Sequence, residues 1–174
     1  MSSLHKGFTL IELLIVIAIV GILVSVVFVA LDPATRFAEA RDAIRQNDVQ
    51  ELLSAIKLYQ VDHEGVHLSS IQNIQGNGVH MIVDGAMATG CNAYNDYCTT
   101  NVSANSTCVN LAQLVTAGYL EAVPISPAGE VVWDDGSTSG EKGTGFTLEV
   151  SNDGLVTVRT CEEEETSTEI QASR

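Results

Sequence analysis

The chain has 174 residues and a formal net charge of −14, from 22 acidic and 8 basic side chains. This length allows one ordinary domain and an extension. In residues 66–174 only three basic side chains accompany 14 acidic ones, so this part of the chain repels the phosphates of nucleic acid. The charge therefore argues against direct nucleic-acid binding by the C-terminal part.

The first predicted element is an apolar helix over residues 8–31, which include three polar side chains, Thr9, Glu12 and Ser25. Such a helix is about 36 Å long and crosses a hydrocarbon core of about 30 Å. A secretory signal fits poorly, because its apolar core is shorter and a cleavage site follows directly. A membrane anchor fits better, with Lys6 keeping the N-terminus in the cytoplasm. Neither interpretation explains a carboxylate inside the apolar run.

The stretch KGFTLIELLIVIAIVGIL closely resembles the type III signal of type IV prepilins and the related pseudopilins. In that family a short basic leader ends in Gly, the mature chain begins with Phe, and a Glu follows four residues later. The resemblance implies that residues 1–7 are a leader peptide, which a membrane-embedded prepilin peptidase removes by cutting after Gly7. It also implies N-methylation of the new amine of Phe8, and a role for Glu12 in filament assembly.

Glu12 also has a physical explanation in this scheme. An uncompensated charge deep in a spanning helix costs about 2.5–3.5 kcal/mol on insertion scales. Cleavage after Gly7 creates a cation at Phe8, and an ion pair at about 4 Å gains on the order of 4 kcal/mol at an effective dielectric constant of ~20. The partner amine belongs either to the same subunit or to a neighbouring one, where pairing would select the register. The resemblance favours the neighbouring subunit.

Residues 32–65 form the second predicted element, an amphipathic helix. Apolar side chains recur at close to helical spacing over residues 37–59, with charged residues between them. Gly65 is the expected stop. Pro33, which follows Asp32, suits the first turn of a helix or kinks a continuous one. We therefore expect a long helix with a kink at Pro33 and a second half that packs on a head.

Residues 66–161 are predicted to form a globular head. Residues 66–107 are rich in Gly, Asn, Ser and Thr, which indicates a partly irregular αβ-type connection, and a short helix is expected from about Val109 to Leu120. The strand candidates are HMIV at 80–83, EVVW at 130–133, GFTLEV at 145–150 and LVTVRT at 155–160, the last two joined by the hairpin signal SNDG.

The expected fold class is α+β and type IV pilin-like. A long N-terminal helix, membrane-spanning in its first half and amphipathic in its second, would pack on a small antiparallel β-sheet. Residues 162–174 contain the run EEEE and few apolar side chains, so they are predicted to form an acidic, disordered tail.

Four cysteines, Cys91, Cys98, Cys108 and Cys161, indicate two disulfides formed in an oxidising compartment. A metal site is the competing interpretation, but the sequence has no Cys-x-x-Cys pair and each His stands alone. Four cysteines permit three pairings. The six-residue loop in CNAYNDYC favours Cys91–Cys98 and leaves Cys108–Cys161, although the sequence alone does not decide the connectivity.

The sequence contains no catalytic constellation, neither a Gly-x-Ser-x-Gly motif nor a phosphate-binding glycine loop. We therefore expect no enzyme activity and no cofactor. Asp134 and Asp135 are weak candidates for calcium ligands, because Ca²⁺ takes several carboxylate and carbonyl oxygens from flexible loops. The EF-hand spacing is absent. His63, His67 and His80 are interpreted as surface residues rather than ligands.

These features predict a structural subunit of a type IV pilus-like filament. The precursor would span the cytoplasmic membrane once, with its N-terminus in the cytoplasm. After processing, an assembly machinery in that membrane would add it to a helical homo-oligomer outside the cell or in the periplasm, for adhesion, motility or DNA uptake. One alternative is a pseudopilin of a type II secretion or competence system. Another is a membrane-tethered binding domain that never polymerises.

Overall fold

The computed structural model describes residues 7–84, 98–103, 108–127, 142–166 and 168–174. The chain divides into two compact units, Met1–Ala38 and Glu39–Arg174. The boundary lies inside the second helix, so most of that helix belongs to the second unit, which we call the head.

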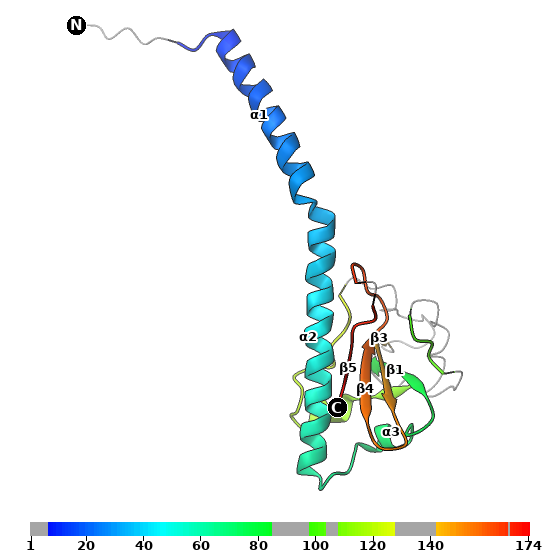
Figure 1. The fold of residues 1–174 in the computed structure, drawn as a ribbon. Helices are drawn as coiled ribbons and strands as arrows, with labels where there is room; N and C mark the ends of the chain where they lie inside the picture. Colours follow the sequence, from blue (N-terminus) through cyan, green and yellow to red (C-terminus); the bar gives the residue numbers. More distant parts are fainter. Residues whose placement is uncertain (1–6, 85–97, 104–107, 128–141, 167) are drawn as a thin grey trace, which may run out of the picture. The chain divides into compact units, whose positions relative to one another are not determined.

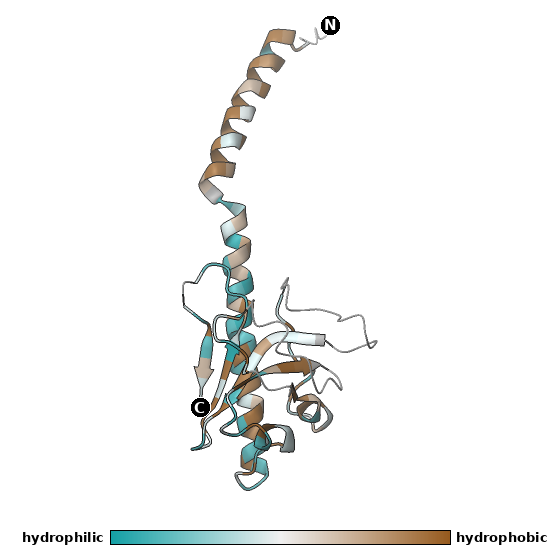
Figure 2. Ribbon diagram, turned by 90° about the vertical axis from the view of Figure 1, so that its right-hand side faces the viewer, coloured by the Kyte–Doolittle hydropathy of each residue, from teal (hydrophilic) through white to brown (hydrophobic). Residues whose placement is uncertain are grey.

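The first unit contains helix α1 (Leu10–Leu31), which is apolar along most of its length (Figure 2). Every residue from Leu10 to Ala30 is exposed, which is unfavourable for such side chains in water. In the described residues, the helical segment that begins at Leu10 is long and apolar enough to cross a membrane. The predicted apolar N-terminal helix is therefore confirmed, and its surface needs lipid or protein around it.

Helix α1 ends at Leu31, two residues before Pro33. Asp32 caps it with a left-handed backbone, φ 35° and ψ 72°, and α2 (Pro33–Asp62) begins at the next residue. Asp32 Oδ2 accepts a hydrogen bond of 2.8 Å from the hydroxyl of Thr35, which stabilises the start of α2. Pro33 occupies the first position of a helix, where its missing N–H costs nothing.

Within the head, α2 supplies one wall of the main hydrophobic core. Its buried apolar side chains recur every three or four residues, so they form one face of the helix; they are Val49, Leu52, Leu53, Ile56 and Tyr59. The helix ends at Asp62, and Glu64 and Gly65 follow with left-handed backbones, as the predicted stop at Gly65 requires. A short helix, α3 (Ser69–Gln72), continues the chain.

In the described residues, five strands form one mixed sheet in the order β2-β1-β3-β4-β5. Figure 1 labels β1, β3, β4 and β5 of this sheet. The strands are β1 (Val79–Asp84), β2 (Val109–Asn110), β3 (Lys142–Val150), β4 (Val156–Thr160) and β5 (Gln171–Ser173). The β1–β3, β3–β4 and β4–β5 pairs are antiparallel, whereas β1 and β2 are parallel. The head is therefore α+β, and the sequence predicted neither the parallel pair nor strand β5.

The two faces of the sheet carry different cores, because side chains alternate along each strand. Phe146, Leu148 and Val150 of β3 pack with the buried face of α2 in the main core. Met81 and Val83 of β1 belong to a smaller cluster that includes the Cys98–Cys161 disulfide. The predicted strand EVVW lies outside the described residues.

The predicted helix from Val109 to Leu120 is wrong in its first part and too long. Val109 and Asn110 form β2 instead, and α4 is limited to Ala112–Thr116. The side-chain oxygen of Asn110 accepts a hydrogen bond of 2.7 Å from the N–H of Ala112, which favours a turn rather than a continuous helix. Gly118 then has a φ of 82°, which ends the helical path.

The prediction of a disordered tail over residues 162–174 is also wrong. Strand β5 pairs with β4, and the backbones of Val156 and Arg174 exchange hydrogen bonds of 2.9 and 3.1 Å. The segment is ordered because the head supplies basic and hydroxyl partners for its carboxylates, and the sequence pattern of the tail does not contain these partners.

Candidate functional site

The expected processing site lies just before α1. Phe8 is 86% exposed and α1 begins two residues later. A Cβ atom built on Gly7 would meet no atom within 4 Å, and its φ is not among the positive values that favour glycine. Within the part of the chain that the structure describes, packing therefore does not require glycine at residue 7.

Glu12 closes a capping box at the start of α1. Its Oε2 atom accepts hydrogen bonds from the backbone N–H of Thr9 at 2.8 Å and from the Thr9 hydroxyl at 2.7 Å. In return, the N–H of Glu12 donates to the Thr9 hydroxyl oxygen at 3.3 Å. Thr9 has an extended backbone and acts as the N-cap. The carboxylate thus satisfies donors that a helix N-terminus leaves free.

The head contains a buried ionic cluster, which we define as Asp42, Arg45 and Glu164. Arg45 is 1% exposed, and its Nη1 contacts Asp42 Oδ1 at 2.8 Å and Glu164 Oε1 at 2.9 Å. The remaining guanidinium donors reach the Ser126 hydroxyl and the Pro127 carbonyl, each at 2.9 Å. A buried guanidinium with all of these partners is a structural anchor rather than a reactive group.

Glu164 connects this cluster to the surface. Arg41 contacts both of its carboxylate oxygens, and the Nε contact to Oε1 is 2.7 Å long. The hydrogen bond from Arg41, together with that from Arg45, lowers the pKa of Glu164 from 4.5 to about 2. The backbone N–H groups of Glu164 and Glu165 donate to Asp42. The acidic run is therefore fixed to α2 by its backbone as well as by a side chain.

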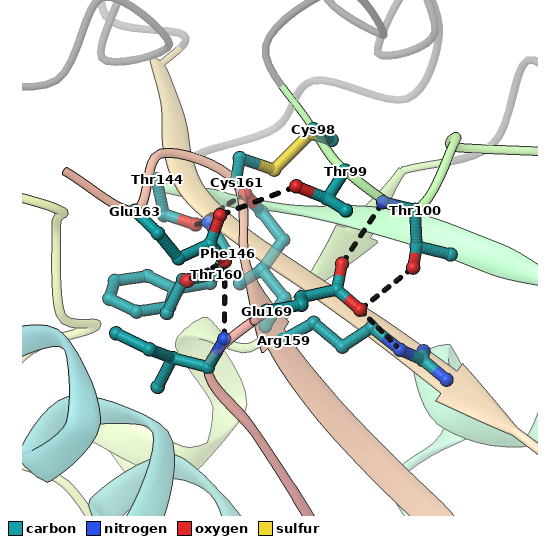
Figure 3. The surroundings of a disulfide bond; sticks show 12 residues. Cys98, Thr99, Thr100, Thr144, Phe146, Arg159, Thr160, Cys161, Glu163 and Glu169 are labelled. Carbon is teal, nitrogen blue, oxygen red and sulfur yellow. Dashed lines mark hydrogen bonds and ion pairs between the residues drawn. A yellow bond between two sulfur atoms is a disulfide. The ribbon is translucent and has the colours of Figure 1, made fainter. Parts of the chain in front are cut away.

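A disulfide joins Cys98 to Cys161 in the smaller hydrophobic cluster, which is separate from the main core that α2 covers. Figure 3 shows it beside two hydroxyl residues that contact the C-terminal segment. The N–H and hydroxyl of Thr100 donate to Glu169 at 3.0 and 2.7 Å, and the hydroxyl of Thr99 donates to Glu163 at 3.4 Å.

The guanidinium of Arg159 contacts Glu169 at 3.5 Å (Figure 3). It also contacts Glu149 of β3 at 2.6 Å. These contacts hold the C-terminal segment to the segment after β1 and to β4 (Figure 3).

The favoured cysteine pairing, Cys91 with Cys98 and Cys108 with Cys161, is wrong, because Cys98 pairs with Cys161. The short loop between Cys91 and Cys98 did not predict the pairing of Cys98. The fold instead places Cys161, just after β4, next to Cys98 although 63 positions separate them in the sequence. Cys108 is also disulfide-bonded, and Cys91 lies outside the described residues.

Asp134 and Asp135, the calcium candidates, also lie outside the described residues. Within the described ones, no group of three or more His, Cys, Asp or Glu side chains could hold a metal ion. The interpretation of the histidines as surface residues is wrong for His80, which is fully buried in β1. His63 is exposed and stacks on Tyr59, with ring centroids 3.8 Å apart.

Thr9 is the residue of the N-terminal site that sequence reasoning missed. The signal was present, because Thr-x-x-Glu before an apolar run is the pattern of a capping box. Arg45 and Glu164 were missed for a different reason. The residues next to each of them in the sequence do not indicate a partner, and only the fold brings the two side chains together.

Comparison with known proteins concerns the N-terminal region. A family model described as the prokaryotic N-terminal methylation motif matches residues 2–28. The Type IV major pilin protein PilE1 of Neisseria gonorrhoeae and the Fimbrial protein of Neisseria meningitidis serogroup B are each 48% identical to the chain over 63 residues. These matches cover 36% of the chain and 36–37% of the relatives, so the chain spans little more than a third of their length. No solved structure matches the chain.

The methylation motif at residues 2–28 includes most of the exposed apolar helix α1, and this combination is the one expected of a prepilin signal. Over its N-terminal region the chain is similar to type IV pilins, and its α+β head is consistent with a pilin-like fold.

Proposed function

We propose that the protein is the structural subunit of a type IV pilus-like filament. The observation that carries the proposal is the exposed apolar surface of α1, with Glu12 at its start and a methylation motif around it. The precursor spans the cytoplasmic membrane through α1. In the filament, the α1 helices of many copies cover one another, and the heads face the solvent.

Processing begins with hydrolysis of the peptide bond between Gly7 and Phe8. Water adds across the C–N bond, which leaves a carboxylate on Gly7 and an amine on Phe8. A methyl donor then methylates this amine. The steric freedom around Gly7 and the 86% exposure of Phe8 support access by a peptidase. We attribute the glycine at the cut to a requirement of that enzyme, since the packing of the described residues does not call for glycine there.

Glu12 then guides assembly by attracting the Phe8 amine of a neighbouring subunit. A carboxylate among apolar side chains is unfavourable unless a cation or hydrogen-bond donors compensate it. The Phe8 amine of the neighbouring subunit reaches the Glu12 carboxylate in only one axial alignment of the two helices. The ion pair therefore selects this alignment, which contacts between apolar surfaces alone would not specify. The protein has a structural role and is a substrate of the processing enzymes.

Mass spectrometry of filaments sheared from cells tests this proposal. We expect a mature chain that begins with N-methylated Phe8 as the dominant species, and the Glu12→Gln variant to be cleaved but to yield few filaments. Wild-type yield from Glu12→Gln contradicts the assembly role. A mature chain that stays in the membrane and never polymerises supports a tethered binding domain instead, and a short periplasmic filament supports a pseudopilin.

A further inference from the structure

The outer edge of β5 carries backbone groups that point away from the sheet. Among the described residues, β5 is the last strand in the sheet order. Val156 and Arg174 exchange hydrogen bonds of 2.9 and 3.1 Å, and such pairs alternate with non-hydrogen-bonded pairs along an antiparallel ladder. Ser173, which lies opposite Thr157, is therefore a non-hydrogen-bonded position, as is Gln171. The backbone N–H and C=O groups of Ser173 and Gln171 point outward, and such an edge can pair with another chain.

A groove of about 400 Å³ lies beside this edge. Gln171 of β5 lines the groove together with residues of α2 and of the segment before β5. Two of its carboxylates are exposed and come from different elements, Glu39 from α2 and Glu165 from the C-terminal segment. Among the described residues that line the groove, four are acidic and none is basic. The groove therefore favours cationic side chains.

We propose that the edge of β5 and this groove bind an extended segment of a partner protein that is rich in lysine or arginine. The segment adds a strand to the sheet by pairing its backbone with Gln171 and Ser173. Its cationic side chains lie against Glu39 and Glu165. All four residues belong to the head, so this inference goes beyond filament assembly through α1 and does not depend on it.

The charge of the groove selects this occupant over a second copy of the chain. Two copies paired through their β5 edges would bring two acidic grooves together, and like charges across an interface are unfavourable. The whole chain carries a formal net charge of −14, so two copies also repel each other as they approach. A basic partner is attracted instead.

The backbone groups of β5 require that this partner is an extended peptide. Strand β5 has three residues, so backbone pairing supplies few hydrogen bonds, and charge contacts in the groove must add to them. A ligand that offers only one of these two contributions should therefore bind weakly.

Fluorescence anisotropy of a labelled peptide with the full chain in detergent tests the proposal. The probe is a short peptide of alternating lysine and valine, which places its lysines on one face of an extended strand. We expect this peptide to bind. The same peptide with glutamate in place of lysine should not bind, because its charge is reversed. A lysine–valine peptide with every backbone nitrogen methylated keeps its charge but cannot donate, so it should bind about tenfold more weakly.

Variants of the head separate the two contributions. Ser173→Pro removes an outward N–H and should weaken binding of the lysine–valine peptide about fivefold. Ser173→Ala loses the same hydroxyl but keeps the N–H, so it should bind as the wild type does. Glu165→Gln should weaken binding by up to about fivefold, the scale of an exposed ion pair. Glu121→Gln, an exposed acid outside the groove, is its matched control and should leave binding unchanged.

Amide hydrogen exchange measured by NMR locates the bound peptide. Exchange should slow at the N–H groups of Gln171 and Ser173 when the peptide is added. It should change little at Arg174, whose N–H already donates to Val156.

Several results would overturn the proposal. Absence of binding, or equal binding of the methylated peptide, contradicts strand addition. Equal binding of the glutamate peptide contradicts the role of the groove charge. Binding without slower exchange at Gln171 and Ser173 places the peptide elsewhere. Slower exchange at these residues without peptide, increasing with protein concentration, assigns the edge to a second copy of the chain.

Discussion

Arg45 and Glu164 form an ion pair of 2.9 Å although 119 residues separate them in the sequence. The same guanidinium nitrogen contacts Asp42 at 2.8 Å, and the Asp42 side chain is only 6% exposed. One buried cation therefore joins two carboxylates, one from α2 and one from the acidic segment that follows β4. The order of the C-terminal segment depends on this helix residue.

Replacement of Arg45 by Met should strongly destabilise the head. The variant leaves the Asp42 carboxylate buried without its cation, and breaking a buried pair typically costs about 3–5 kcal/mol. We expect a loss of that size in the free energy of unfolding, measured by urea titration of the full chain in detergent.

Arg41→Met is the matched control for this experiment. Arg41 also contacts Glu164, but its side chain is 32% exposed, and exposed ion pairs contribute about 0–1 kcal/mol. Equal losses from Arg41→Met and Arg45→Met would contradict the anchoring role of the buried guanidinium.

Acid should weaken the head through Glu164. The hydrogen bonds from Arg41 and Arg45 lower the pKa of Glu164 to about 2 in the folded state, against an ordinary value of 4.5. A lowered folded-state pKa stabilises the fold above the ordinary pKa, and this stability is lost as the pH falls from about 4.5 to 2. Unfolding midpoints measured across this range should decrease for the wild type. They should change less for Glu164→Gln, and parallel curves would contradict the prediction.

The sequence predicted the features that local pattern determines. The apolar run alone specifies α1, and the alternation around SNDG specifies the β3–β4 hairpin, where the N–H of Gly154 donates to the carbonyl of Ser151 at 3.0 Å. The methylation motif at residues 2–28 was recognisable because its spacing along the chain is itself the signal, whereas the individual roles of Gly7, Phe8 and Glu12 stay predictions.

The sequence did not predict the contacts that only the folded chain creates. Cys98 meets Cys161 because the end of β4 returns to the segment after β1, and no spacing rule contains that path. Strand β2 has two residues, too few to show alternation, and it exists because β1 offers an edge for pairing. The acidic tail appeared disordered since its partner Arg45 lies on a distant helix.

Gly145→Ala should destabilise the head by steric overlap as well as by backbone strain. Gly145 has a φ of 78°, and a Cβ there would lie 2.6 Å from the Cβ of Ser126. Left-handed backbone costs about 1–2 kcal/mol for a residue with a Cβ, and overpacking costs about 1–3 kcal/mol more. Chemical denaturation should therefore give a loss above 2 kcal/mol, a sum of these estimates.

Gly118→Ala separates the two contributions. Gly118 has a similar φ of 82°, but a Cβ there would meet nothing within 4 Å, so only the backbone strain applies. The difference between the two losses measures the overlap with Ser126. Identical losses would show that the close approach relaxes without cost.

Removal of the Cys98–Cys161 disulfide should destabilise the head and release the C-terminal segment. The bond closes a loop across 63 positions, for which chain entropy gives about 4 kcal/mol. The Cys98→Ala/Cys161→Ala double variant should lose stability on that scale. Its Thr100–Glu169 contact should weaken, so that amide hydrogen exchange rises at β5. Peptide mapping of the unreduced wild type should first recover a Cys98–Cys161 crosslink, and a crosslink between Cys91 and Cys98 in its place would contradict the observed pairing.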